Sequence, residues 1–109
     1  MEEKDIEALA KEYTELAEKI EALQYQIAQF KVQKYEIERA KEEIEKSEGR
    51  IYSSVGGVLV ETTKEQALND IKERYELIET KISSLTSQLN ETKEREKKLE
   101  AELSKYRQK

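Results

Sequence analysis

The sequence of 109 residues contains no cysteine, histidine, tryptophan or proline, and only one phenylalanine. Without histidine or cysteine it lacks the common side chains for a general base or a nucleophile. It also has no glycine-rich loop followed by lysine and Ser/Thr that could hold a phosphate. We therefore expect no enzyme, no cofactor and no metal site. The absence of proline favours long helices, because one proline would remove a backbone donor.

Long apolar runs and basic character are also missing. No stretch approaches the roughly 18 apolar residues that cross a membrane, and no apolar segment of a signal peptide follows Met1–Asp5. We expect no membrane association, and a cytoplasmic location is the default. The net charge of −5 argues against a nucleic-acid partner, because phosphate binding needs a basic surface.

The apolar residues recur at alternating spacings of three and four, which is typical of a coiled-coil seam. In each of two series, ten of twelve seam positions are apolar. Disorder, the competing interpretation of a chain with 41% charged residues, would not produce this pattern twice. The first series is Ile6, Leu9, Tyr13, Leu16, Ile20, Leu23, Ile27, Phe30, Lys34, Ile37, Lys41 and Ile44, and the second is Leu68, Ile71, Tyr75, Ile78, Ile82, Leu85, Leu89, Thr92, Glu96, Leu99, Leu103 and Tyr106.

Between the two series the helical period stops. Residues 51–63 are rich in β-branched side chains around the pair Gly56-Gly57, which predicts two short strands and a tight turn. Gly49 suits the end of the first helix, and Thr63 with Gln66 forms a capping-box pattern for the second. The predicted fold class is mainly α, a long antiparallel two-helix coiled coil joined by one β-hairpin. We expect a single domain over 1–109, with a helix over 1–48, the hairpin over 50–62 and a helix over 63–108.

Charge supports the antiparallel arrangement. Residues 1–19 carry seven acidic and three basic groups, whereas residues 93–109 carry four acidic and seven basic groups. A short connection aligns residues whose numbers sum to about 112, which places charged seam positions opposite apolar ones. These charged seam positions are Lys34, Lys41 and Glu96. Control of the register is their favoured role, and binding of a partner is the alternative.

The hairpin cannot cover its own apolar side chains, and an isolated two-stranded hairpin is marginally stable in water. Unpaired strand edges with apolar groups favour pairing with another chain. We therefore predict oligomerisation through the hairpin, in preference to a solitary hairpin folded on the helix ends. The predicted oligomerisation residues are Ile51, Tyr52, Val55, Gly56, Gly57, Val58, Leu59 and Val60.

The segment from Ile51 to Ala67, set between two heptad helices, resembles the β-class subunit of prefoldin. The shared run is Ile51-Tyr52-x-x-Val55-Gly56-x-x-Leu59-Val60-x-Thr62-Thr63-Lys64-Glu65-x-Ala67. The single hairpin is similar to that of the archaeal β subunit, in contrast to the two-hairpin α class. Ser53-Ser54 and Gly57 depart from the usual pattern of the family.

This resemblance implies an ATP-independent holdase chaperone. Its partners would be the prefoldin α subunit and other copies of this chain in an α2β4 hexamer, whose hairpins form an oligomeric β-barrel. The tips of the coiled coil would hold unfolded polypeptide clients and deliver them to a group II chaperonin. The client-binding residues would be Ile6, Leu9, Tyr13, Leu16, Leu99, Leu103 and Tyr106. Alternatively, these side chains only complete the coiled coil.

Three other interpretations stay open. A structural coiled-coil scaffold or spacer would explain both seams but not the β-rich connection. A nucleic-acid-binding arm at the basic C-terminal end is weakened by the acidic helix beside it. Finally, an apolar stripe lies outside the seam and comprises Tyr25, Ala28, Val32 and Tyr35. It is either ordinary surface, or the inner wall of the cavity of an assembly or a contact with a neighbouring subunit.

Overall fold

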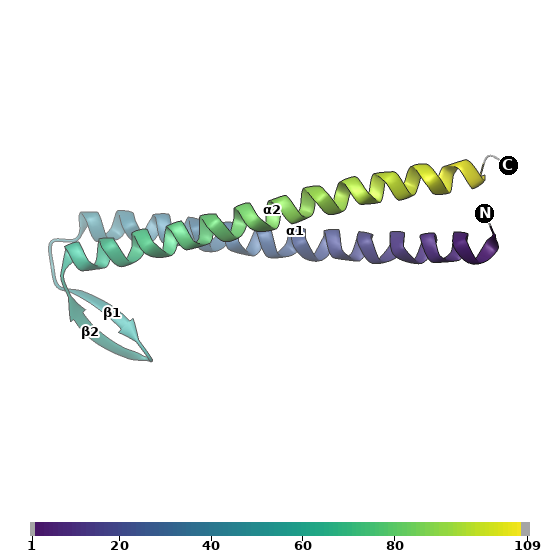
Figure 1. Ribbon diagram of the computed structural model, residues 1–109. Coiled ribbons are helices and arrows are strands. Elements are labelled where there is room, and N and C mark those ends of the chain that lie inside the picture. The colour runs from purple at the N-terminus through teal and green to yellow at the C-terminus, as the bar shows by residue number, and fades with distance from the viewer. Residues whose placement is uncertain (1, 108–109) are drawn as a thin grey trace. The chain divides into compact units, whose positions relative to one another are not determined.

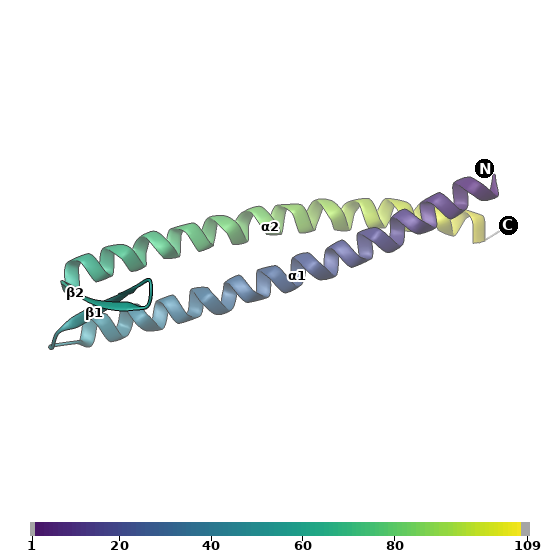
Figure 2. The same cartoon turned by 90° about the horizontal axis from the view of Figure 1, so that it is seen from below.

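The computed structural model describes residues 2–107, which form two helices and two strands (Figure 1). In chain order these are α1 (Glu3–Lys46), β1 (Ile51–Val55), β2 (Val58–Thr62) and α2 (Lys64–Arg107). Segments of α1 and α2 lie side by side and run in opposite directions (Figures 1 and 2). The prediction of two long antiparallel helices joined by one β-hairpin is therefore confirmed.

The chain divides into two compact units. The hairpin unit is Gln29–Ile82, and the terminal unit consists of Met1–Ala28 and Ser83–Lys109. Each unit contains a stretch of both helices, so each has its own section of the seam between them.

In the terminal unit, the predicted seam positions form the buried core. Leu23, Ile27 and Leu99 are buried, and the other apolar seam positions are half-buried. Thr92 is also buried, and its hydroxyl donates to the Gln88 carbonyl at 2.7 Å. A buried hydroxyl with a hydrogen-bond partner is tolerated in a core, so this polar residue does not interrupt the seam.

An ion pair joins the two helices of the terminal unit. Arg95 donates from Nε to Glu12 Oε1 at 3.0 Å and from Nη2 to Glu12 Oε2 at 3.3 Å. The hydrogen bond and the charge of Glu12 raise the pKa of Arg95. A two-point contact of this kind constrains orientation as well as distance. It agrees with the pairing of an acidic first helix and a basic second helix that the sequence predicts.

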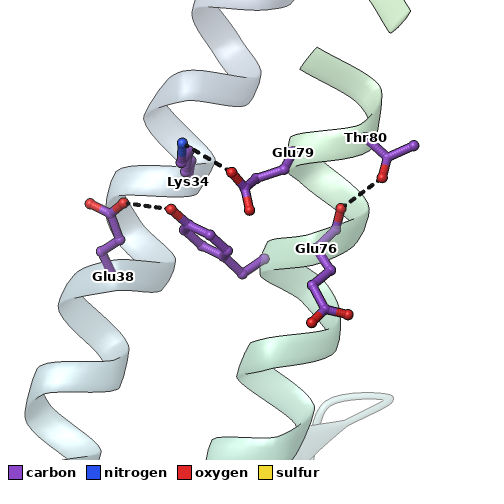
Figure 3. A network of polar contacts seen from close by, with 6 residues as sticks. Lys34, Glu38, Glu76, Glu79 and Thr80 are labelled. Atoms are coloured by element: carbon purple, nitrogen blue, oxygen red, sulfur yellow. Dashed lines mark hydrogen bonds and ion pairs between the residues drawn. The ribbon is translucent and has the colours of Figure 1, made fainter. Parts of the chain in front are cut away.

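In the hairpin unit, Lys34 of the predicted seam takes part in a network of polar contacts between the two helices (Figure 3). Its ammonium group lies 3.7 Å from Glu79 Oε2 and 5.2 Å from the centre of the Tyr75 ring. The Tyr75 hydroxyl donates to Glu38 Oε1 at 3.3 Å. Tyr75 is the main cause of a raised pKa at Lys34, with a smaller contribution from Glu79. The lysine is thus held across the seam by specific partners, as a register-setting residue would be.

Lys41, the second lysine of the predicted seam, behaves differently. Its side chain is exposed and lies 3.9 Å from Glu45 Oε1, one turn along the same helix. This contact is within α1, so it does not constrain the position of α2.

The end of α1 is capped by a lysine of α2. Lys64 Nζ donates to the carbonyl oxygens of Glu45 at 2.7 Å and Ser47 at 3.2 Å. The last carbonyls of a helix lack partners in their own helix, and a cation there is favourable. The assignment of this role to Gly49 was wrong, because Gly49 does not have the positive φ of a left-handed helix stop.

At the start of α2, only one of the two hydrogen bonds of the predicted capping box forms. The Thr63 hydroxyl accepts a hydrogen bond from the Gln66 backbone N–H at 3.1 Å. The Gln66 side chain does not return to Thr63 but donates to Asp70 Oδ1 at 2.9 Å. An i, i+4 partner within the helix therefore replaces the second bond of the capping box.

The strands pair antiparallel, with Ile51 opposite Thr62 and Val55 opposite Val58. Gly56 and Gly57 form the two-residue turn with φ of 55° and 83°. Positive φ at both positions is the geometry that suits the twist of a hairpin, and it favours glycine. The predicted hairpin and its turn are confirmed.

Candidate functional site

The hairpin carries apolar side chains on both of its faces. Side chains alternate along a strand and paired residues share a face, so Tyr52 and Leu59 lie on the face opposite to that of Val55, Val58 and Val60. All five are exposed, and Leu59 has the largest exposed fraction, 70%. Of the other predicted assembly residues, Ile51 is half-buried and the two turn glycines are exposed.

The hairpin turns back along the helices of its unit (Figures 1 and 2). A groove of about 900 Å³ lies between it and α2. We call it the hairpin groove; its lining includes the whole of β1 together with Ile44, Ala67, Ile71, Arg74 and Leu77. Of the apolar hairpin side chains, Ile51, Tyr52 and Val55 line this open groove. Its wall on α2 is mixed, because Asp70 and Glu73 lie there beside the apolar residues.

Leu77 is a feature that the sequence analysis missed. It lies on α2 between the seam residues Tyr75 and Ile78, yet its side chain is 57% exposed. It lines the hairpin groove and also a second groove of about 490 Å³, which includes Phe30 and Ile37. An apolar residue outside the heptad positions was the available signal, but the sequence does not show that Leu77 lies beside the hairpin.

The predicted client-binding residues all lie in the terminal unit and along its seam. Leu99 is fully buried, with 0% exposure. The others are half-buried: Ile6, Leu9, Tyr13, Leu16, Leu103 and Tyr106. In this conformation their apolar surface is directed mainly to the other helix, so extensive contact with a client requires the helix ends to separate.

The burial of Leu99 predicts a large loss of stability when it is truncated. Leu99→Ala should lower the free energy of unfolding by about 2–4 kcal/mol, because a fully buried leucine loses both transfer free energy and packing. Urea unfolding followed by circular dichroism measures the change. Leu77→Ala is the control and should cost less than about 1 kcal/mol, because exposed substitutions have small effects. Equal losses in the two variants would contradict the assignment of Leu99 to the core.

The apolar stripe outside the seam is exposed as the sequence predicts. Val32 and Tyr35 belong to the hairpin unit, and Tyr25 and Ala28 to the terminal unit. The large side chains Tyr25, Val32 and Tyr35 are each more than half exposed. A contact role for this stripe stays a prediction.

Neither a membrane span nor a metal site is found among residues 2–107. Neither α1 nor α2 has a stretch that is both long and apolar enough to cross a bilayer. No group of three or more acidic side chains lies close enough together, in this described part of the chain, to hold a metal ion.

These features define a class of protein, an antiparallel coiled coil that carries one exposed β-hairpin. The family model for prefoldin subunits matches residues 7–109, and the chain belongs to this family. The resemblance to the β subunit that the sequence predicted is confirmed by the comparisons that follow.

Among curated proteins, the chain is similar to the prefoldin β subunits of Pyrobaculum neutrophilum and Pyrococcus furiosus. Identity to the first is 43% over 56 residues, which cover 51% of this chain and 44% of that protein. Identity to the second is 41% over 49 residues, covering 45% and 42% respectively. The matched region therefore spans less than half the length of these relatives.

Two solved structures from Thermococcus strain KS-1 are also similar. The prefoldin β2 subunit is 31% identical with a TM-score of 0.62, and the match covers 88% of this chain and 97% of that chain. The prefoldin β subunit matches in fold with a TM-score of 0.87 at 24% identity, covering 94% of this chain and 91% of the other.

Proposed function

We propose that this protein is a subunit of an ATP-independent holdase chaperone in the cytoplasm. In this proposal the hairpin joins subunits, and the helix ends hold unfolded polypeptide before its transfer to a group II chaperonin. The observation that carries the proposal is the exposure of apolar side chains on both faces of the hairpin, together with membership of the prefoldin family. A hairpin that served only as a connector would not need these side chains.

The assembly that best suits this chain is a hetero-oligomer with α-type prefoldin subunits, of composition α2β4. Neighbouring hairpins would pair along their free edges in a barrel, because a closed barrel satisfies the unpaired strand edges. It would also bury Tyr52 and Leu59 on one face and Val55, Val58 and Val60 on the other. Both faces of a barrel strand can be covered, one by the barrel interior and the other by neighbouring elements.

Client binding would use the ends of the helices in the terminal unit. Helix ends open more easily than their middles, because local unfolding concentrates where few apolar contacts hold the chain. Opening would expose Leu99 and its half-buried neighbours as one apolar surface for a non-native polypeptide. No nucleotide is required, because the energy of holding comes from burial of apolar surface.

A suppression assay tests the proposal. The pure protein, alone and with a prefoldin α subunit, is added to a chemically denatured client, and light scattering follows aggregation without nucleotide. We expect scattering to be suppressed in proportion to the assembled protein. Unchanged client aggregation under both conditions would contradict the holdase function.

A structural coiled-coil spacer is the second candidate function. The observation in its favour is the closed seam of the terminal unit, where Leu99 is completely covered. A spacer would assemble through the hairpin and leave client aggregation unchanged, so the same assay separates the two functions.

A further inference from the structure

We propose that the hairpin groove receives the hairpin of a second copy of this chain, so that assembly uses the surface of α2 as well as the hairpin itself. This inference rests on the proposed hairpin-mediated assembly. It adds to that assembly an α2 surface centred on Leu77, which neither the heptad pattern nor the hairpin motif includes.

Helix α2 carries an uncovered apolar side chain beside the hairpin. Leu77 projects outside the seam, and with 57% exposure it is among the most exposed large apolar side chains of the two helices. Ile71 of α2 and Val55 of β1 line the same groove. Burial of an exposed leucine side chain is favourable, so a partner bound here would gain from covering Leu77.

The length of the groove matches that of a short strand. The groove is lined by every residue of β1, a strand of five residues, or about 17 Å at the usual rise per residue. Along α2 it extends from Ala67 to Leu77, ten residue steps, or about 15 Å of helix. The two walls are similar in length, and that length matches one strand of about five residues.

The backbone of β1 also favours an extended partner. The sheet contains only β1 and β2 among the residues described, so the outer edge of β1 has no strand beside it. A free strand edge beside exposed apolar side chains such as Leu77 can bind an extended segment, because main-chain hydrogen bonds and side-chain burial act together. The chain itself supplies a suitable segment, since Val58, Leu59 and Val60 are consecutive, exposed and already extended.

The first experiment compares Leu77→Glu with Val32→Glu in the full-length protein. Val32 is the matched control, because its side chain is also 57% exposed and belongs to the hairpin unit but does not line the groove. Sedimentation velocity over a concentration series gives the association constant of each variant. We expect Leu77→Glu to weaken self-association by about tenfold or more, as loss of a central interface residue does, and Val32→Glu to leave it unchanged.

The second experiment measures burial directly and uses the absence of cysteine from the sequence. Leu77→Cys and Val32→Cys each introduce a single thiol, and the rate of its reaction with a maleimide reports its exposure. Between dilute and associated protein, the rate at position 77 should fall by about tenfold or more, whereas the rate at position 32 should stay constant. Circular dichroism confirms that both variants keep the helical content of the parent protein.

Several results would overturn the proposal. The first is unchanged self-association of Leu77→Glu. The second is a maleimide rate at position 77 that falls no more than the rate at position 32 when the protein associates. The third is a parent protein that stays monomeric at high concentration. Protection of position 77 only after an unfolded client is added would assign the groove to clients, and protection only with an α subunit would assign it to that subunit. Aggregation suppression is measured separately. A protein that associates but holds no client would refute the holdase function, and the two experiments above would still decide whether the groove is the contact.

Discussion

Removal of residues 1–15 and 97–109 should abolish suppression of client aggregation while leaving assembly intact. The change removes most of the predicted client-binding residues, including the buried Leu99, but keeps the hairpin unit complete. Light scattering of a denatured client should then follow the curve of the client alone. Sedimentation velocity should give the oligomeric state of the parent protein, because the exposed hairpin is unchanged.

A full-length variant tests the same prediction without shortening the helices. Leu9→Ser with Leu103→Ser reduces the apolar character of the helix ends at two half-buried seam positions. The matched control, Ile20→Ser with Leu85→Ser, makes the same change at half-buried seam positions of the same unit, further from the chain ends. Only the first variant should lose suppression. Retained suppression by the truncated protein, or equal loss in both double variants, would refute a holding role for the helix ends.

Charge on the hairpin should dissociate the assembly. Val55→Asp with Leu59→Asp places one carboxylate on each face of the sheet, where both parent side chains are exposed in the single chain. If neighbouring subunits bury these faces, each carboxylate must be desolvated without a partner, which is strongly unfavourable. We expect self-association to weaken by more than about tenfold, measured by sedimentation velocity.

The control for the hairpin variant is Val32→Asp with Tyr35→Asp, two equally exposed apolar residues of the same unit. This control should assemble as the parent protein does. Loss of assembly should also weaken client holding, because one chain contacts the client at one place and an oligomer at several. A hairpin variant that remains fully assembled would refute assembly through the hairpin.

The seams could be predicted because they depend on local spacing. An α-helix returns to the same face every three to four residues, so apolar residues at those spacings must lie on one side whatever else the chain does. Thr92 shows where the rule reaches its limit. It is one of the two positions of the second seam series that are not apolar, yet its hydroxyl donates to the Gln88 carbonyl and the residue is buried.

The caps at the helix junction could be predicted only in part. The bond from the Gln66 backbone to Thr63 involves neighbours in sequence and was foreseen. The contact of Lys64 with Glu45 and Ser47 was not, because it joins residues that are 17 and 19 positions apart through a long flexible side chain. Sequence patterns carry no information on which of many lysines comes within reach of a given carbonyl.

The sequence by itself determined the two helices, their antiparallel pairing, the glycine turn and the presence of apolar side chains that the hairpin cannot cover. Each of these follows from spacing, turn chemistry or composition, which act over a few residues. The tertiary structure alone decided that the hairpin turns back along α2, that Leu77 joins Val55 at one groove, and that Leu99 is completely enclosed. The first two outcomes depend on the direction in which the hairpin leaves the helices, and the third on how completely residues of the two helices pack around one side chain. Both are set by contacts between residues far apart in the chain.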